Sequence, residues 1–73
     1  MEVYKGYFLD VDYCVKYSKI YKVFWYEVTT NGHVYRSIGT ATSLEACILC
    51  AEQGISLVNV DFAYLASIWT IIS

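Results

Sequence analysis

The chain has 73 residues, of which 58% are hydrophobic, 18% are aromatic and 16% are charged, and its formal net charge is −2. Domains in water average about 45–50% apolar and about 25% charged residues, so this chain carries more apolar surface than one small domain can hide. Its acidic balance argues against a general nucleic-acid binder, because such domains carry a basic surplus. We therefore expect a single domain over residues 1–73 that self-associates or binds a protein partner.

The start of the chain shows neither a basic segment nor an uninterrupted apolar stretch, which predicts no signal peptide and a cytoplasmic location. Three cysteines agree with this, because a secreted disulfide framework normally uses an even number, and free thiols are expected. The longest run of apolar or small residues spans about 11 positions, whereas a membrane-spanning helix needs about 20. We therefore expect no membrane partner.

Two strands are predicted at the start of the chain. Val11, Tyr13, Val15 and Tyr17 alternate with polar residues or a cysteine, and this period of two is typical of a half-buried strand. Residues 3–9 are the expected partner strand.

Asn31-Gly32 predicts a hairpin of residues 20–30 with residues 33–40, because a type I′ turn needs positive φ at both central positions and this pair tolerates it. The turn fixes the register of the two strands. The expected pairs are Thr30 with His33, Val28 with Tyr35, Glu27 with Arg36, and Trp25 with Ile38.

The hairpin has two faces, and neither is plainly polar. The face expected to pack on a helix consists of Phe24, Tyr26, Val28 and Tyr35. The other face consists of Val23, Trp25, Ile38 and the opposite charges of Glu27 and Arg36. A half-solvated antiparallel sheet has one polar face, so we expect the second face to be covered by another element or another chain.

One helix is predicted at about residues 43–53. The sequence Thr42-Ser43-Leu44-Glu45 forms a capping box that satisfies the free N–H groups of a helix start, and Gly54 is the expected stop. Spacing on the helix predicts a buried stripe of Leu44, Cys47, Ile48 and Ala51, with Glu45, Glu52 and Gln53 facing water. Residues 56–62 are predicted as a strand. Residues 62–72 are also predicted as a strand, with a short helix as the alternative. The expected fold is α+β, an antiparallel sheet of about four to five strands packed on one helix.

Cys47 and Cys50 have the C-x-x-C spacing of thiol oxidoreductases and of half a zinc site. The capping box places Cys47 a turn inside the helix, so we interpret both as packed core thiols, with a metal site including Cys14 or His33, or redox chemistry, as alternatives. His33 follows the turn directly and is expected to lie in solvent. No catalytic motif is present, so we expect no enzyme activity, no metal and no cofactor.

Lys16, Lys19 and Lys22 interleave with Tyr17 and Tyr21, a mixture that can contact phosphates and stack on bases. Three lysines are few for that purpose, and lysines commonly protect exposed strand edges from aggregation. We favour a solvated edge. Phosphate contact by these three lysines is the alternative.

The sequence thus indicates a non-enzymatic interaction protein that binds a macromolecular partner and forms a homo-oligomer through an aromatic face. Its expected interaction surface is Trp25, Tyr26, Tyr35 and Arg36, because Trp, Tyr and Arg dominate interface hot spots. In size and style the chain resembles the accessory proteins of phages and mobile elements, which implies inhibition of a host factor. The alternative is a protein that binds or sequesters a small nucleotide in an aromatic-lined site at an oligomer interface.

Overall fold

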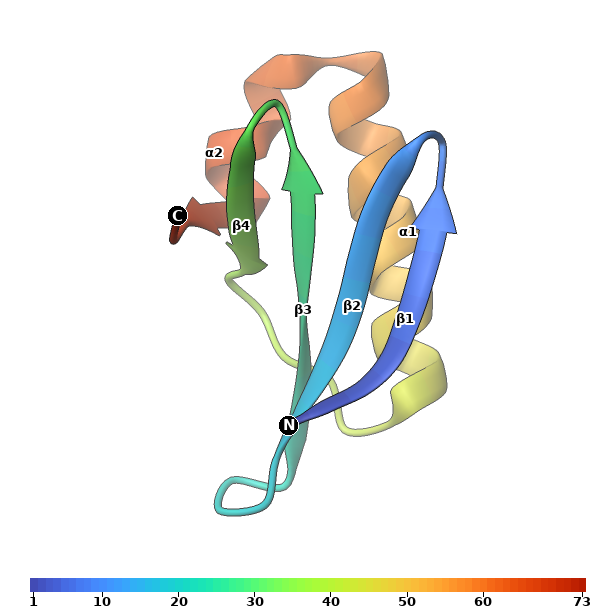
Figure 1. Cartoon of the computed structure of the whole chain (residues 1–73), viewed down its shortest axis with the longest axis vertical. Helices are drawn as coiled ribbons and strands as arrows, with labels where there is room; N and C mark the ends of the chain where they lie inside the picture. The colour runs from blue at the N-terminus through green and yellow to red at the C-terminus, as the bar shows by residue number, and fades with distance from the viewer.

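The computed structural model covers all 73 residues and has two layers, a five-stranded antiparallel sheet and a helix packed on one of its faces (Figure 1). The strands pair with their neighbours in sequence order. They are β1 (Glu2–Phe8), β2 (Val11–Ser18), β3 (Val23–Thr30), β4 (His33–Ser37) and β5 (Trp69–Ile71). Helix α1 (Leu44–Val60) is followed by the short 3₁₀ helix η1 (Phe62–Tyr64) and by α2 (Leu65–Ile68). The predicted α+β fold is confirmed.

The turn at Asn31-Gly32 has the predicted conformation, with φ of 54° and 74°. The register that follows from it is confirmed for Thr30 with His33, Val28 with Tyr35 and Glu27 with Arg36. The hairpin of β1 and β2 closes in the same way through Leu9 and Asp10, whose φ values are 49° and 63°. No glycine marks that turn.

The predicted pairing of Trp25 with Ile38 is wrong, because β4 ends at Ser37. The Ser37 hydroxyl accepts a hydrogen bond from the Tyr26 backbone N–H at 3.2 Å and donates one to the Gly39 carbonyl at 2.9 Å. The Ser37 side chain thus takes the place of a backbone hydrogen bond between β3 and β4 at Tyr26. Beyond it the loop returns to β3, where Phe24 and Ala41 exchange two backbone hydrogen bonds of 2.8 Å.

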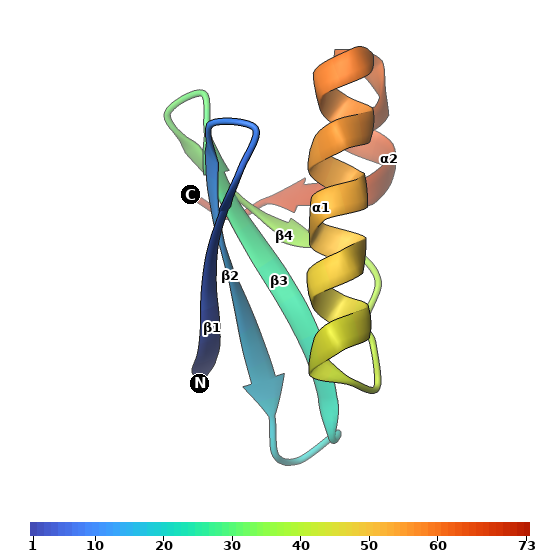
Figure 2. The same cartoon turned by 90° about the vertical axis from the view of Figure 1, so that its right-hand side faces the viewer.

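The core lies between α1 and the sheet face that α1 covers, which we call the inner face (Figure 2). Its buried residues are Tyr13, Val15, Tyr26, Val28, Tyr35 and Trp69 from the sheet, with Cys47, Ala51 and Ile55 from α1. Two side-chain hydrogen bonds secure this packing, from the Tyr13 hydroxyl to the Glu52 carboxylate and from Trp69 Nε1 to the Tyr26 hydroxyl, both 2.9 Å long. Every buried side-chain nitrogen or oxygen has a hydrogen-bond partner.

Helix α1 differs from the prediction at both ends. Its N-cap is Ser43, whose hydroxyl accepts from the Ala46 N–H at 3.1 Å, so the capping box built on Thr42 is wrong by one residue. The helix also continues past Gly54 to Val60. A glycine is needed at position 54 for another reason, because a Cβ there would lie 2.7 Å from the Tyr26 hydroxyl oxygen. Gly54 allows a close approach between helix and sheet and does not end the helix.

The predicted strand at 56–62 is wrong, because residues 56–60 extend α1, Asp61 is its C-cap and Phe62 begins η1. The predicted strand at 62–72 is wrong except for Trp69–Ile71, the three residues that pair with β4. Ile55 and Val58 continue the apolar stripe of the helix, so helical geometry buries Ile55 in the core and packs the partly buried Val58 against it. No helix in the structure has the length and apolar character needed to cross a membrane.

Candidate functional site

The sheet face opposite α1 has no element over it, and we call it the open face (Figure 2). Side chains alternate along a strand, so the neighbours of the buried Tyr26, Val28 and Tyr35 point to this side. As predicted, Trp25, Glu27 and Arg36 lie away from the helix. The open face also carries Lys5, Tyr7, Asp12, Cys14, Lys16, Thr29 and Val34.

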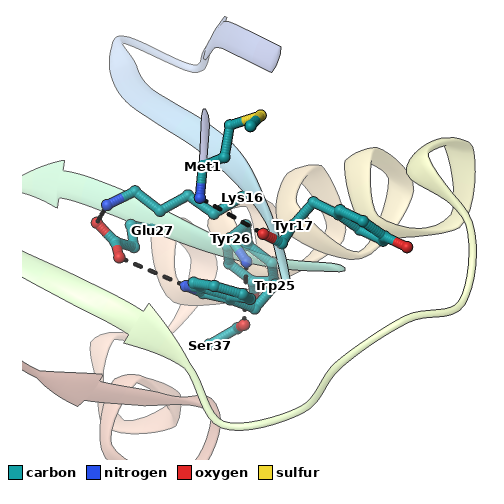
Figure 3. Close-up of polar contacts among 7 residues, drawn as sticks. All are labelled: Met1, Lys16, Tyr17, Trp25, Tyr26, Glu27 and Ser37. Atoms are coloured by element: carbon teal, nitrogen blue, oxygen red, sulfur yellow. Dashed lines mark hydrogen bonds and ion pairs between the residues drawn. The ribbon is translucent and has the colours of Figure 1, made fainter. Parts of the chain in front are cut away.

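A polar network crosses the open face at Trp25 (Figure 3). The Trp25 Nε1 donates to the Glu27 carboxylate at 3.4 Å, and the other Glu27 oxygen forms the structure's single ion pair, 3.1 Å from Lys16 Nζ. Arg36 is the register partner of Glu27, yet its guanidinium carbon lies 5.0 Å from the centre of the Trp25 ring. Arg36 is therefore exposed and has no carboxylate partner.

An open pocket of about 330 Å³ lies beside this network. It is lined by Ser18, Tyr21, Val23, Trp25, Arg36 and Thr40. Thr40 belongs to the loop that returns to β3, and no local signal in the sequence marks it. Tyr21 is the aromatic residue that the sequence places among the lysines of the β2–β3 connection. The pocket thus combines two aromatic rings with one cation that has no carboxylate partner.

The four residues of the expected interaction surface lie on two different sides. Trp25 and Arg36 meet on the open face. Tyr26 and Tyr35 are only 7% and 6% exposed and lie in the core, so a partner cannot contact them in the folded chain. The interaction surface expected from the sequence is therefore corrected to Trp25 and Arg36, with the pocket around them. Tyr26 and Tyr35 instead pack on the inner face against Trp69. The Tyr26 hydroxyl accepts from Trp69 Nε1, and the Tyr35 ring centre lies 5.6 Å from that of Trp69.

The basic residues gather toward the β2–β3 end of the sheet. Lys16 lies on the open face, while Lys19 and Lys22 are exposed in the connection that follows β2. A wider pocket of about 570 Å³ runs along β1 and β2, and the carboxylates of Glu2, Asp12 and Glu27 line it together with Lys5. The open face therefore presents charges of both signs and no continuous basic track.

The three cysteines lie in different surroundings. Burial, with a smaller contribution from Cys50, raises the pKa of the Cys47 thiol to about 11. Burial and then the Glu27 and Glu2 carboxylates raise the pKa of the Cys14 thiol. Cys50 is exposed, so its predicted place in the core is wrong. Three residues turn a helix by about 300°, which moves Cys50 off the buried stripe.

These positions predict the order of thiol reactivity. We expect one cysteine, Cys50, to react quickly with a thiol reagent in the native protein, and Cys14 and Cys47 to react slowly, because burial and a raised pKa both reduce the thiolate. Mass spectrometry of the labelled chain measures this, and Cys50→Ser is the control that removes the fast phase. Rapid native labelling of Cys47 would contradict the assignment.

His33 lies far along the chain from all three thiols, and its Nδ1 is 3.3 Å from the Ser73 carbonyl oxygen. The structure brings together no group of three or more His, Cys, Asp or Glu side chains suited to a metal ion. The pocket at Trp25 and Arg36 is therefore the candidate site with the most defined chemistry. No protein-family model, no curated protein and no solved structure matches this chain.

Proposed function

We propose that this chain is a non-enzymatic binding domain whose open face docks on an acidic region of a protein partner. The observation that carries the proposal is the state of Arg36, which is stacked on Trp25 and forms no ion pair, although Glu27 lies opposite it on the neighbouring strand. Stacking holds the guanidinium plane while its N–H groups stay free for a bidentate contact with a carboxylate. The Glu27 carboxylate instead pairs with Lys16 and accepts a hydrogen bond from Trp25 Nε1.

Charge favours a protein over a nucleic acid as the partner. Glu2, Asp12 and Glu27 share the open face with the basic residues and would repel a phosphate backbone laid along it. A protein surface can instead place one acidic group at Arg36 and basic groups elsewhere. Trp and Arg at the centre of such a contact are typical hot-spot residues.

Occupying a surface of another protein is also the mode of action of inhibitors encoded by phages and mobile elements. The proposed function is of that class, with the chain acting in the cytoplasm. Trp25 would bury apolar area in the contact, and the Arg36 guanidinium would orient the partner through a bidentate contact with a carboxylate. Lys19 and Lys22 lie at the edge and would add to the rate of encounter.

Nuclear magnetic resonance of the two tryptophan indole N–H groups tests the proposal. We expect a peptide that carries one glutamate flanked by lysines to shift the Trp25 signal while the signal of the buried Trp69 stays in place. Arg36→Ala is expected to weaken binding by about tenfold, the usual loss for a hot-spot arginine. Arg36→Lys should recover only part of it, because lysine lacks the planar fork.

The matched control is Lys5→Ala, which removes a cation from the same face at the wider pocket and is expected to leave the affinity unchanged. Oligothymidylate and ADP serve as competing probes. An unmoved Trp25 signal with the peptide would contradict the proposal. Tighter binding of ADP than of the peptide would support the nucleotide-binding alternative, in which Tyr21 and Trp25 stack on the base and the lysines contact phosphate.

A further inference from the structure

The side of α1 that points away from the sheet is apolar, although no element covers it. We call its five exposed residues the outer ridge, and they are Ala46, Leu49, Gln53, Leu57 and Val60. Leu49 is 58% exposed and Val60 is 82% exposed. Figures 1 and 2 show η1 and α2 beside α1, in the same layer, and not over this side. A surface helix normally carries charged residues here, so the outer ridge has the character of an interface.

We propose that a second copy of this chain docks on the outer ridge, with the two α1 helices antiparallel about a two-fold axis at Gln53. The spacing of the ridge carries this inference. Leu49 and Leu57 lie four residues on either side of Gln53, and Ala46 and Val60 lie seven residues on either side. A two-fold contact requires a surface that is complementary to itself. Antiparallel pairing meets that requirement by placing Leu49 against Leu57 and Ala46 against Val60.

Gln53 is the one polar residue of the outer ridge, and the axis places it against its own copy. An amide side chain has both donors and an acceptor, so the two Gln53 side chains can hydrogen-bond to each other. A single polar residue in an apolar helix pair fixes the register of the two helices. Gln53 would therefore specify the alignment that the flanking apolar residues stabilise.

Charge disfavours a charged partner and favours the antiparallel direction for a second copy. The acidic residues of α1, Glu45 and Glu52, lie off the outer ridge, and the helix has no basic residue, so the ridge offers nothing to a charged partner. A parallel pair would align the two helix dipoles and bring the two Glu45 carboxylates together. An antiparallel pair sets each helix N-terminus beside the other's C-terminus, which the dipoles favour.

The size of the ridge sets the expected strength of the dimer. Helix α1 has 17 residues and is therefore about 25 Å long. Stable interfaces bury about 800 Å² on each partner, and one face of such a helix supplies less, so we expect association that depends on concentration in the micromolar range. The ridge and the open face lie on opposite sides of the chain (Figure 2), so the dimer would leave two open faces free.

The sequence placed self-association on an aromatic face. The structure buries Tyr26 and Tyr35 of that face in the core, and the exposed apolar side chains of α1 lie on the outer ridge. The inference is independent of the proposed function, because it concerns the other side of the molecule.

Analytical ultracentrifugation of the full chain tests the contact. We expect the mass to rise above 8.4 kDa with concentration and to approach twice that value. Leu49→Glu is expected to keep the chain monomeric at every concentration, because each dimer would then bury two unpaired carboxylates. Leu49 is exposed in the folded chain, so circular dichroism should show the fold retained. The matched control is Ile20→Glu, a similar change at a residue 85% exposed in the β2–β3 connection, which should leave the dimer intact.

Disulfide formation tests the direction of the helices. In a Cys50→Ser background, Gln53→Cys is expected to form an interchain disulfide under mild oxidation, because the axis brings the two positions together. Leu49→Cys in the same background should not, because position 49 faces position 57 of the other copy. Cross-linking through position 49 and not through position 53 would overturn the antiparallel arrangement.

A mass that stays at 8.4 kDa at every concentration, or a dimer that survives Leu49→Glu, would overturn the outer ridge as an interface. Loss of the dimer with Ile20→Glu would overturn it as well. The two proposals can fail separately. Leu49→Glu is expected to leave the peptide-induced shift of the Trp25 signal as it is in the unmodified chain. Arg36→Ala is expected to leave the mass of the dimer unchanged.

Discussion

Tyr26→Ala is expected to lower the free energy of unfolding by about 3–5 kcal/mol, the usual cost of truncating a buried aromatic side chain. Tyr26 is 7% exposed, and its hydroxyl accepts the hydrogen bond of Trp69 Nε1, so the substitution leaves a cavity and an unpaired indole N–H. A chain of this size has a total stability of only about 4–11 kcal/mol. The variant is therefore expected to be largely destabilised, as urea or thermal unfolding followed by circular dichroism will measure.

The adjacent residue provides the matched control. The Trp25 side chain is larger than that of Tyr26, but it lies half-exposed on the open face. Trp25→Ala removes a stacking partner of Arg36 and a donor to Glu27, both near solvent, and is expected to cost about 1 kcal/mol or less. If Trp25→Ala unfolded the chain and Tyr26→Ala melted normally, the assignment of the two sheet faces would be reversed.

Gly54→Ala is expected to destabilise the fold by about 1–3 kcal/mol, the usual cost of overpacking a core. Helix propensity alone gives the opposite sign, since alanine is favoured over glycine inside a helix by about 1 kcal/mol. The clash decides the outcome, because the new Cβ would lie 2.7 Å from the Tyr26 hydroxyl oxygen and 3.4 Å from Trp69 Nε1. Urea unfolding of the variant measures the difference.

A double-mutant cycle identifies the cause. Tyr26→Phe removes the oxygen that the new Cβ would meet, so the double variant should be less destabilised than the two single changes together. Asn59→Ala, at an exposed position of α1 that is not part of the outer ridge, is the control and is expected to be close to neutral. A stabilised Gly54→Ala variant would show that the helix and the sheet separate enough to admit a methyl group.

If both proposals hold, the domain has two binding surfaces, the open face for a partner and the outer ridge for a second copy. Under the two proposals each surface would bind by different chemistry, with a stacked arginine on one side and an apolar helix on the other. Dimerisation would place two weak sites in one particle, and a partner with two acidic regions would then gain from a high effective concentration. The tests of the two surfaces are separate, so this combination can be resolved one surface at a time.

The features that the sequence determined by itself are local. The Asn31-Gly32 turn set the register of β3 and β4, because positive φ at two successive residues leaves one way to continue both strands. The alternation in β2 identified a strand, and the spacing of Cys47 and Ala51 identified the buried side of α1. Together these also separated Trp25 and Arg36 from the face that packs on the helix.

Tertiary contacts decided the rest. Gly54 has the sequence signature of a helix stop, yet the helix passes through it, and glycine stands there because Tyr26 occupies the space where a side chain would be. Thr40 reaches the candidate pocket only because the loop after Ser37 returns to β3. In each case the deciding neighbour is distant along the chain, so no window of local sequence contains the interaction that fixes the outcome.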